Sequence, residues 1–226
     1  MKTQTEQIDM MAELFIDKLQ EKVWEYWIPP LSADKYLIKV QGTQSLEEKK
    51  DVLQKLVLCY RSETMSNKGY YTEDIRNKFV RTFLSLTSMP LIKENIAEFL
   101  LREGGYCEKV RDYESGAVFY AASAGLSVED PFIRYFSLNN LGFCLNFIRK
   151  FDEAEKVLRQ AIAFDPGKYN SWKNLGVSLE WQGQYEEAAE SFLKAYNLSK
   201  GEPRAHLHLK RLLDRHPTLK KLPCFS

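Results

Sequence analysis

The sequence is poor in the residues that most often carry out catalysis and hold metals. It has 3 histidines in 226 residues, and all of them lie between His206 and His216. His206 and His208 are two positions apart, so on a helix they point away from each other and do not suit a shared metal. The 4 cysteines lie far apart without Cys-x-x-Cys spacing, which predicts reduced thiols rather than a zinc or disulfide framework. We therefore expect no metal site and no cofactor.

The sequence also lacks a strong net charge and a long apolar run. Its 32 Lys+Arg and 31 Asp+Glu nearly cancel, which argues against nucleic acid and membrane surfaces as partners. No window approaches the roughly 18 apolar residues of a membrane span, and the first residues lack the apolar core of a secretory signal. These absences predict a cytoplasmic protein without a nucleic-acid or membrane partner.

The charge is nevertheless distributed unevenly. From Arg204 to the end, six basic residues stand against Asp214, which leaves +5 there and −4 over the rest. A basic tail can bind an acidic partner. It can equally be the usual composition of the C-terminal end of a helix, where cations interact favourably with the helix dipole.

No motif with a catalytic spacing is present. Pro166-Gly167-Lys168 lacks the glycine spacing of a phosphate loop, and Ser191 and Lys194 form a Ser-x-x-Lys pair inside a predicted helix. Gly104-Gly105 favours the end of a helix over a nucleotide loop. We predict that the protein is not an enzyme, and an active site within residues 1–95 is the remaining alternative.

Apolar residues recur every three or four positions over most of the chain, which predicts an almost wholly helical protein. Ser45 and Glu48 form a capping box that opens a helix with Leu53, Leu56 and Val57 on its apolar face. The other expected elements before residue 130 are a helix over 5–27, a possible strand at Tyr36–Val40, a helix capped by Thr72, one from about Leu91 to Glu103 ended by Gly104-Gly105, and one over about 109–124.

The second half of the chain contains an internal repeat. Small and large apolar residues recur at a constant offset of 34 positions, and six coincidences at one offset are not expected by chance. The matching positions are Leu141-Gly142 and Leu175-Gly176, Phe151 and Tyr185, Ala154 and Ala188, Leu158 and Phe192, and Ala161 and Ala195.

These residue classes suit a pair of antiparallel helices. The small residues let the two helices of one pair approach closely, and the large residues fill the space between successive pairs. Because one pair cannot bury its apolar face alone, the pairs are expected to stack into a solenoid.

The pattern resembles the tetratricopeptide repeat family, which repeats Trp, Leu-Gly, Tyr, Gly, Tyr, Ala, Phe, Ala and Pro. The departures at Leu145, Leu179, Arg149 and Lys200 keep apolar bulk or fall in turns. The matches are Leu138, Leu141-Gly142, Phe151, Ala154, Leu158, Ala161 and Pro166 in the first unit, and Trp172, Leu175-Gly176, Gly183, Tyr185, Ala188, Phe192 and Ala195 in the second.

The resemblance implies an all-α, right-handed superhelix of antiparallel helix hairpins with an N-terminal helical extension. Residues 96–226 form the array in this interpretation, and residues 1–95 are a helical region that resembles no family. The predicted parts of the array are a degenerate unit at 97–130, repeats at 135–168 and 169–202, and a terminal helix at 203–216.

In this family the first helix of each pair lines a concave groove that binds peptides. The resemblance implies that Asn140 and Asn174, which are 34 positions apart, project into this groove and contact a peptide backbone. A solvated polar face is the alternative interpretation. The remaining predicted groove residues are Asn139, Lys173, Phe143, Asn170 and Arg204.

The function predicted from the sequence is a non-catalytic adaptor that binds a peptide or protein segment in the groove. The alternative is a structural or homo-oligomerising protein, such as a homodimer, whose N-terminal helices form the interface and whose groove is filled by its own chain. Lys173 and Arg204 suit a carboxylate, but the upstream positions Leu101 and Gly105 do not complete the basic clamp of relatives that bind acidic tails.

Overall fold

The computed structural model describes residues 45–64, 71–86, 93–126, 128–199 and 203–225. These residues form helices, and no strand occurs among them. The expected helix over 5–27 and the possible strand at Tyr36–Val40 lie outside the described residues. The elements are α3 (Leu46–Thr64), α4 (Glu73–Ser85), α5 (Lys93–Lys109), α6 (Tyr113–Gly125), α7 (Pro131–Phe147), α8 (Phe151–Phe164), α9 (Tyr169–Trp181), α10 (Tyr185–Leu198), α11 (Pro203–Arg215), and the 3-10 helices η2 (Pro217–Lys221) and η3 (Pro223–Phe225).

The chain divides into two compact units, residues 1–75 and 76–226. In the first unit, the Ser45 hydroxyl accepts a hydrogen bond from the Glu48 N–H at 3.4 Å, as the predicted cap requires. Thr72 accepts from the Ile75 N–H at 3.3 Å and opens α4. The division predicted at residue 95 separates the part of the sequence that resembles a known family from the part that does not. It stays a prediction.

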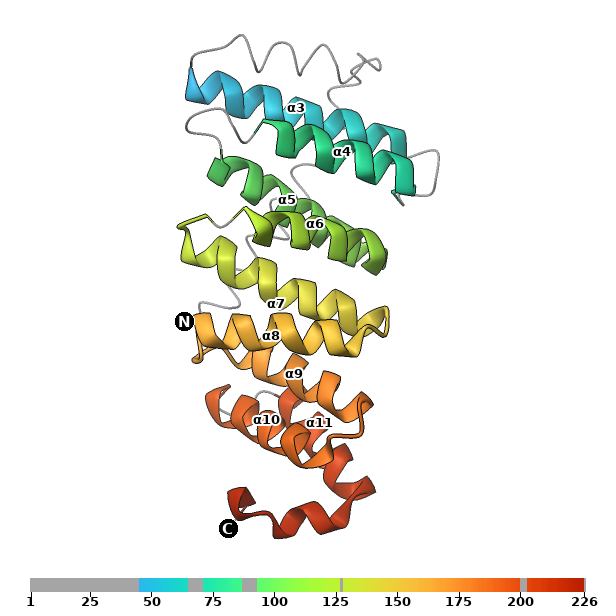
Figure 1. The fold of residues 1–226 in the computed structure, drawn as a ribbon, viewed down its shortest axis with the longest axis vertical. Coiled ribbons are helices and arrows are strands. Elements are labelled where there is room, and N and C mark those ends of the chain that lie inside the picture. Colours follow the sequence, from blue (N-terminus) through green and yellow to red (C-terminus); the bar gives the residue numbers. More distant parts are fainter. Residues whose placement is uncertain (1–44, 65–70, 87–92, 127, 200–202, 226) are drawn as a thin grey trace. The chain divides into compact units, whose positions relative to one another are not determined.

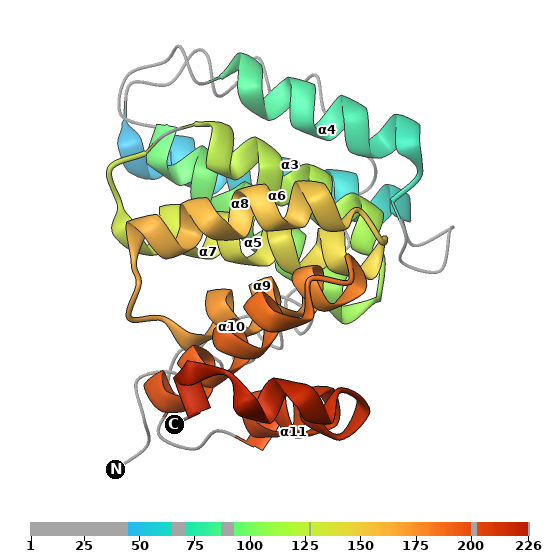
Figure 2. The ribbon, with the colours of Figure 1, turned by 60° about the horizontal axis from the view of Figure 1, so that its bottom comes forward.

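The second unit is a series of antiparallel helix hairpins. The hairpins α5–α6, α7–α8 and α9–α10 follow one another in chain order, and α11 packs on α10 (Figures 1 and 2). We call α5, α7, α9 and α11 the first helices. Consecutive first helices also contact each other, α5 with α7, α7 with α9, and α9 with α11. This arrangement confirms the predicted all-α solenoid of helix hairpins.

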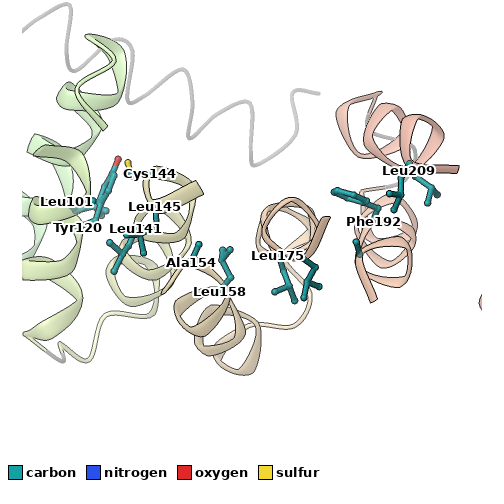
Figure 3. Packing of buried hydrophobic residues seen from close by; sticks show 14 of the residues in the cluster. Leu101, Tyr120, Leu141, Cys144, Leu145, Ala154, Leu158, Leu175, Phe192 and Leu209 are labelled. Carbon is teal, nitrogen blue, oxygen red and sulfur yellow. The ribbon is translucent and has the colours of Figure 1, made fainter. Parts of the chain in front are cut away.

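Glycine allows the close approach of the two helices within each hairpin. A Cβ atom at Gly176 would lie 2.6 Å from the ring of Phe192, and one at Gly142 would collide with Leu158. The side chains of Leu158 and Phe192 lie in the continuous core that Figure 3 shows. The two small residues are therefore needed for the helices to touch, as the repeat pattern predicts.

The expectation that Gly104-Gly105 ends a helix is wrong. Helix α5 continues through both glycines to Lys109. A Cβ at Gly104 would lie 2.5 Å from the ring of Tyr120, so this glycine serves a close helix contact. Tyr120 follows Gly104 by the same 16 positions that separate Phe192 from Gly176 (120 − 104 and 192 − 176). The α5–α6 hairpin thus repeats the packing of the hairpins after it.

The turns inside the hairpins share a left-handed residue. Gly183 has a φ of 78° in the α9–α10 turn, and the equivalent residues of the two preceding turns are Arg149 and Arg111, with φ of 64° and 62°. Glycine adopts this conformation without steric cost, whereas arginine does not. The guanidinium of Arg149 lies 5.2 Å from the centre of the Trp181 ring, a contact that offsets part of this cost.

Candidate functional site

The structure places the predicted groove residues on three neighbouring first helices. Asn139, Asn140 and Phe143 lie on α7. The other predicted residues lie on α9 and α11, and α9 contacts both α7 and α11. These residues differ in burial, and this decides which of them can meet a partner. The α9 and α11 members are Asn170, Lys173, Asn174 and Arg204.

Asn139 and Asn174 are buried between α7 and α9. They are only 5% and 4% exposed, and the Asn174 amide donates to Asn139 Oδ1 at 3.3 Å. The Ser171 hydroxyl lies 3.0 Å from the same oxygen. The expectation that Asn174 projects into an open groove is therefore wrong, because its side chain is buried and its hydrogen bond joins two repeats.

The polar contact between α7 and α9 continues toward the C-terminal ends of the two helices. The Asn146 amide donates to the carbonyl oxygen of Asn174 at 2.9 Å, and the Ser178 hydroxyl donates to Asn146 Oδ1 at 2.8 Å. At the other end, Ser171 also lies 3.0 Å from the Tyr135 hydroxyl. A largely buried, mutually bonded set of this kind fixes the register of one helix against the other.

Asn140 differs from Asn174 although the repeat makes them equivalent. Its side chain is half-buried, it accepts from the Asn139 amide at 2.8 Å, and it is a hydrogen-bond partner of Tyr120. The Tyr120 hydroxyl in turn donates to Glu108. Asn140 is thus tied to the preceding hairpin and still reaches the surface.

Glu108 is the most perturbed carboxyl group near these residues. Burial raises the pKa of Glu108 to about 7, against the opposing effects of the Tyr120 hydrogen bond and the Lys173 charge. Burial also raises the pKa of the Cys144 thiol, and the Glu108 charge adds to that shift. A cysteine with a raised pKa is a poor nucleophile, so this cluster does not resemble a catalytic thiol site.

Aromatic side chains form a stripe along α7, which includes the predicted groove residue Phe143. Phe143 and Phe147 lie 4.8 Å apart between ring centres, and Tyr113 of α6 stacks on Phe147 at 4.1 Å. Phe132 and Phe136 pair at 4.3 Å nearer the start of the helix. Their spacing of 4, 7 and 4 residues places all four phenylalanines on one helical face, a signal that was present in the sequence.

The other predicted residues lie on the surface in different degrees. Asn170 and Lys173 are half-buried on α9, and Arg204 is exposed on α11. Lys173 is close enough to Glu108 for its charge to lower the pKa of that carboxyl. Together with Asn140 and Phe143, these three residues can reach a bound partner.

Among the residues that the structure describes, no group of three or more His, Cys, Asp or Glu side chains is arranged to hold a metal ion. The three histidines instead contact aromatic rings of α10, and two of them stack on these rings while His206 is tilted against Tyr196. His216 lies 3.9 Å from Tyr185, and His208 lies 5.2 Å from Phe192. None of the described helices is both long and apolar enough to cross a bilayer.

Comparison with known proteins finds repeats of one family in the second unit. Family models described as "Tetratricopeptide repeat" match residues 137–168 and 169–201. No curated protein matches the chain.

Solved structures of the same fold are similar to more than half of the chain. One is the Arabidopsis OM64 TPR domain, with a TM-score of 0.50 and 21% identity over 55% of this chain and 98% of that one. Another is MamA from Desulfovibrio magneticus RS-1, with a TM-score of 0.50 and 20% identity over 73% of this chain and 89% of that one. The consecutive hairpins, the repeat-spaced glycines and the two family matches lead to one conclusion: residues 137–201 are two tetratricopeptide repeats within a solenoid of helix hairpins.

Proposed function

We propose that the protein is a non-catalytic adaptor that binds a peptide or protein segment across the first helices. The binding face consists of the accessible residues of α7, α9 and α11, and it corresponds to the concave groove of the family. We call it the first-helix face. The cytoplasmic location expected from the sequence remains part of this proposal.

The exposed aromatic stripe of α7 is the observation that carries the proposal. Phe132 and Phe147 are 46% and 53% exposed, and Phe136 and Phe143 are half-buried beside them. Contiguous exposed aromatic surface is uncommon on proteins that act alone, and aromatic residues are enriched at protein interfaces. A stripe of four phenylalanines on one first helix therefore supports a protein partner.

The burial of the asparagines assigns them different roles in this proposal. Asn140 is accessible and can exchange hydrogen bonds with a partner's backbone. Asn139 and Asn174 hold α7 against α9 and thereby position Phe143 and Asn140. Lys173 and Arg204 contribute positive charge along the same face.

Site-specific photo-crosslinking tests the proposal in the full chain. A photo-reactive phenylalanine analogue at Phe147 of α7 is compared with the same analogue at Phe164 of α8, which is 37% exposed on a second helix. We expect a distinct protein to be crosslinked at position 147 and not at position 164. Equal crosslinking at both positions, or none at position 147, would contradict binding at the first-helix face.

The same experiment separates the alternative function. If the protein is structural or homo-oligomeric with its groove filled by its own chain, the analogue at Phe147 would crosslink to the protein itself. Digestion and mass spectrometry would then identify a peptide of this chain joined to position 147: within a product of one chain mass it would indicate the chain's own segment, and within a product of twice that mass a second copy. Either result would replace the adaptor proposal.

A further inference from the structure

The first-helix face changes in chemistry from one repeat to the next. The same three positions of the repeat can be followed through α7, α9 and α11, because each step adds 34 to the residue number. All nine residues lie on the first helices that contact one another in series. The three rows are Phe136, Asn170 and Arg204; Phe143, Val177 and Arg211; and Phe147, Trp181 and Arg215.

Each row begins with phenylalanine on α7 and ends with arginine on α11. The α7 end is the aromatic stripe, in which Tyr113 also stacks on Phe147. At the α9 positions between the two ends, Asn170 has an amide side chain, Val177 an aliphatic one and Trp181 an aromatic one. The face is therefore aromatic along one edge and basic along the other.

The charges along the basic edge do not cancel. Arg204 and Arg211 are exposed on α11, and Lys173 of α9 adds a third positive charge. Arg215 forms an ion pair with Glu180 of α9, and this pair neutralises one of the positive charges. Asp214 is exposed on α11, and Glu108 lies close to Lys173, so four basic residues stand against three acidic ones along this edge.

The basic residues of α11 are spread along the helix rather than gathered at one point. Arg204 and Arg215 are 11 positions apart, which corresponds to about 16 Å along a helix axis at 1.5 Å per residue. Phe136 and Phe147 have the same separation on α7. A single terminal carboxylate cannot span this length, whereas several acidic side chains on one segment can.

We propose that the first-helix face binds a segment that carries both apolar and acidic side chains, with the apolar ones on α7 and the acidic ones on α11. The inference rests on the proposed function and specifies the partner. Burial of apolar side chains against the phenylalanines supplies affinity. Arginine pairs with carboxylates in directed hydrogen bonds and fixes the orientation of the segment.

A random peptide library tests this partner chemistry. Peptides are displayed with fixed residues on both sides, so that no free C-terminus is offered, and are selected on the full chain. A parallel selection uses the charge-reversed variant Arg204→Glu, Arg211→Glu. The matched control is Lys156→Glu, Lys194→Glu, which makes the same change in net charge at exposed positions of the second helices α8 and α10.

We expect peptides selected on the wild type to be enriched in both aromatic or aliphatic residues and Asp or Glu. The acidic enrichment should disappear on the Arg204→Glu, Arg211→Glu variant and persist on the control. Fluorescence anisotropy with one labelled selected peptide should show at least about tenfold weaker binding to the charge-reversed chain at low salt. The milder pair Arg204→Gln, Arg211→Gln provides the same comparison, and thermal melts verify that each variant is folded.

The outcomes distinguish a failure of this inference from a failure of the proposed function. Comparison of Phe147→Ser with Phe164→Ser shows whether the binding of a selected peptide requires Phe147. If the peptides require Phe147 but are not enriched in acidic residues, only the inferred partner chemistry is overturned. A selection with no peptide that depends on Phe147 would overturn both proposals, as expected if residues 1–44 or a second copy occupy the face.

Discussion

The Asn174 amide nitrogen lies 3.3 Å from Asn139 Oδ1, and this contact joins the first helices of two successive repeats. The Asn139 oxygen also lies 3.0 Å from the Ser171 hydroxyl. All three residues are buried, so water cannot replace a lost bond. This polar contact therefore contributes to the stability of the α7–α9 junction as well as to its geometry.

Asn139→Ala should lower the free energy of unfolding by about 1–3 kcal/mol, because the Asn174 amide would stay buried without this acceptor. Urea denaturation followed by circular dichroism measures the change. Asn197→Ala on the exposed face of α10 is the matched control, and we expect it to stay within about 0.5 kcal/mol of wild type. Equal stability of the two variants would show that the buried contact contributes nothing.

Gly176→Ala tests the close approach of α9 and α10. The added Cβ would lie 2.6 Å from the Phe192 ring, and this overpacking should cost about 1–3 kcal/mol. Gly125→Ala at the end of α6 is the control, since no atom lies within 4 Å of its Cβ position. A Gly176→Ala variant that melts at the wild-type temperature would contradict the packing between the two helices.

The hairpins of the second unit could be predicted from sequence because their contacts use repeated residue classes. Gly142 and Gly176 occur at one offset and face equivalent large side chains, so the pattern itself carries the packing. Gly104 could not be interpreted in the same way. Its partner Tyr120 belongs to a hairpin with few other matches, and a glycine pair alone favours a helix end as much as a close contact.

The predicted binding residues show a different limit of the sequence. Adjacent residues such as Asn139 and Asn140 differ by about 100° around a helix, and the residues of the neighbouring helix decide which one turns inward. The pattern therefore assigned these residues to the first helix of each pair but could not give the burial of Asn174. In contrast, the spacing of Phe132, Phe136 and Phe147 could be read from the sequence, and it indicated an aromatic face along α7.

The left-handed turn residues give a prediction about stability. Arg111→Gly should raise the free energy of unfolding by up to about 1 kcal/mol, because glycine adopts a φ near 62° without a steric penalty. Arg149→Gly should raise it less, since this change also removes the contact with Trp181 at 5.2 Å, which is worth about 0.5–1 kcal/mol. Urea denaturation of both variants checks the difference, and equal gains would mean that the Trp181 contact does not stabilise the turn.

The raised pKa of Glu108 predicts how stability depends on pH. The folded-state pKa is about 7 and the ordinary value is 4.5, so between these values the folded protein binds more protons than the unfolded chain. Stability should therefore fall as pH rises from about 4.5 to 7 through this group, by at most about 3 kcal/mol. The cause is the cost of ionising a carboxyl group that is removed from water, which the Lys173 charge and the Tyr120 hydrogen bond only partly offset.

Glu108→Gln isolates this contribution, because the glutamine carbonyl can still accept from the Tyr120 hydroxyl but does not ionise. We expect the variant to resemble wild type at pH 5 and to be the more stable of the two at pH 8, as measured by urea denaturation at both pH values. Glu190→Gln on α10 is exposed and should follow the wild type throughout. A Glu108→Gln variant that loses as much stability as wild type between pH 5 and pH 8 would show that another group titrates, and Glu108 would then be ionised in the folded protein at neutral pH.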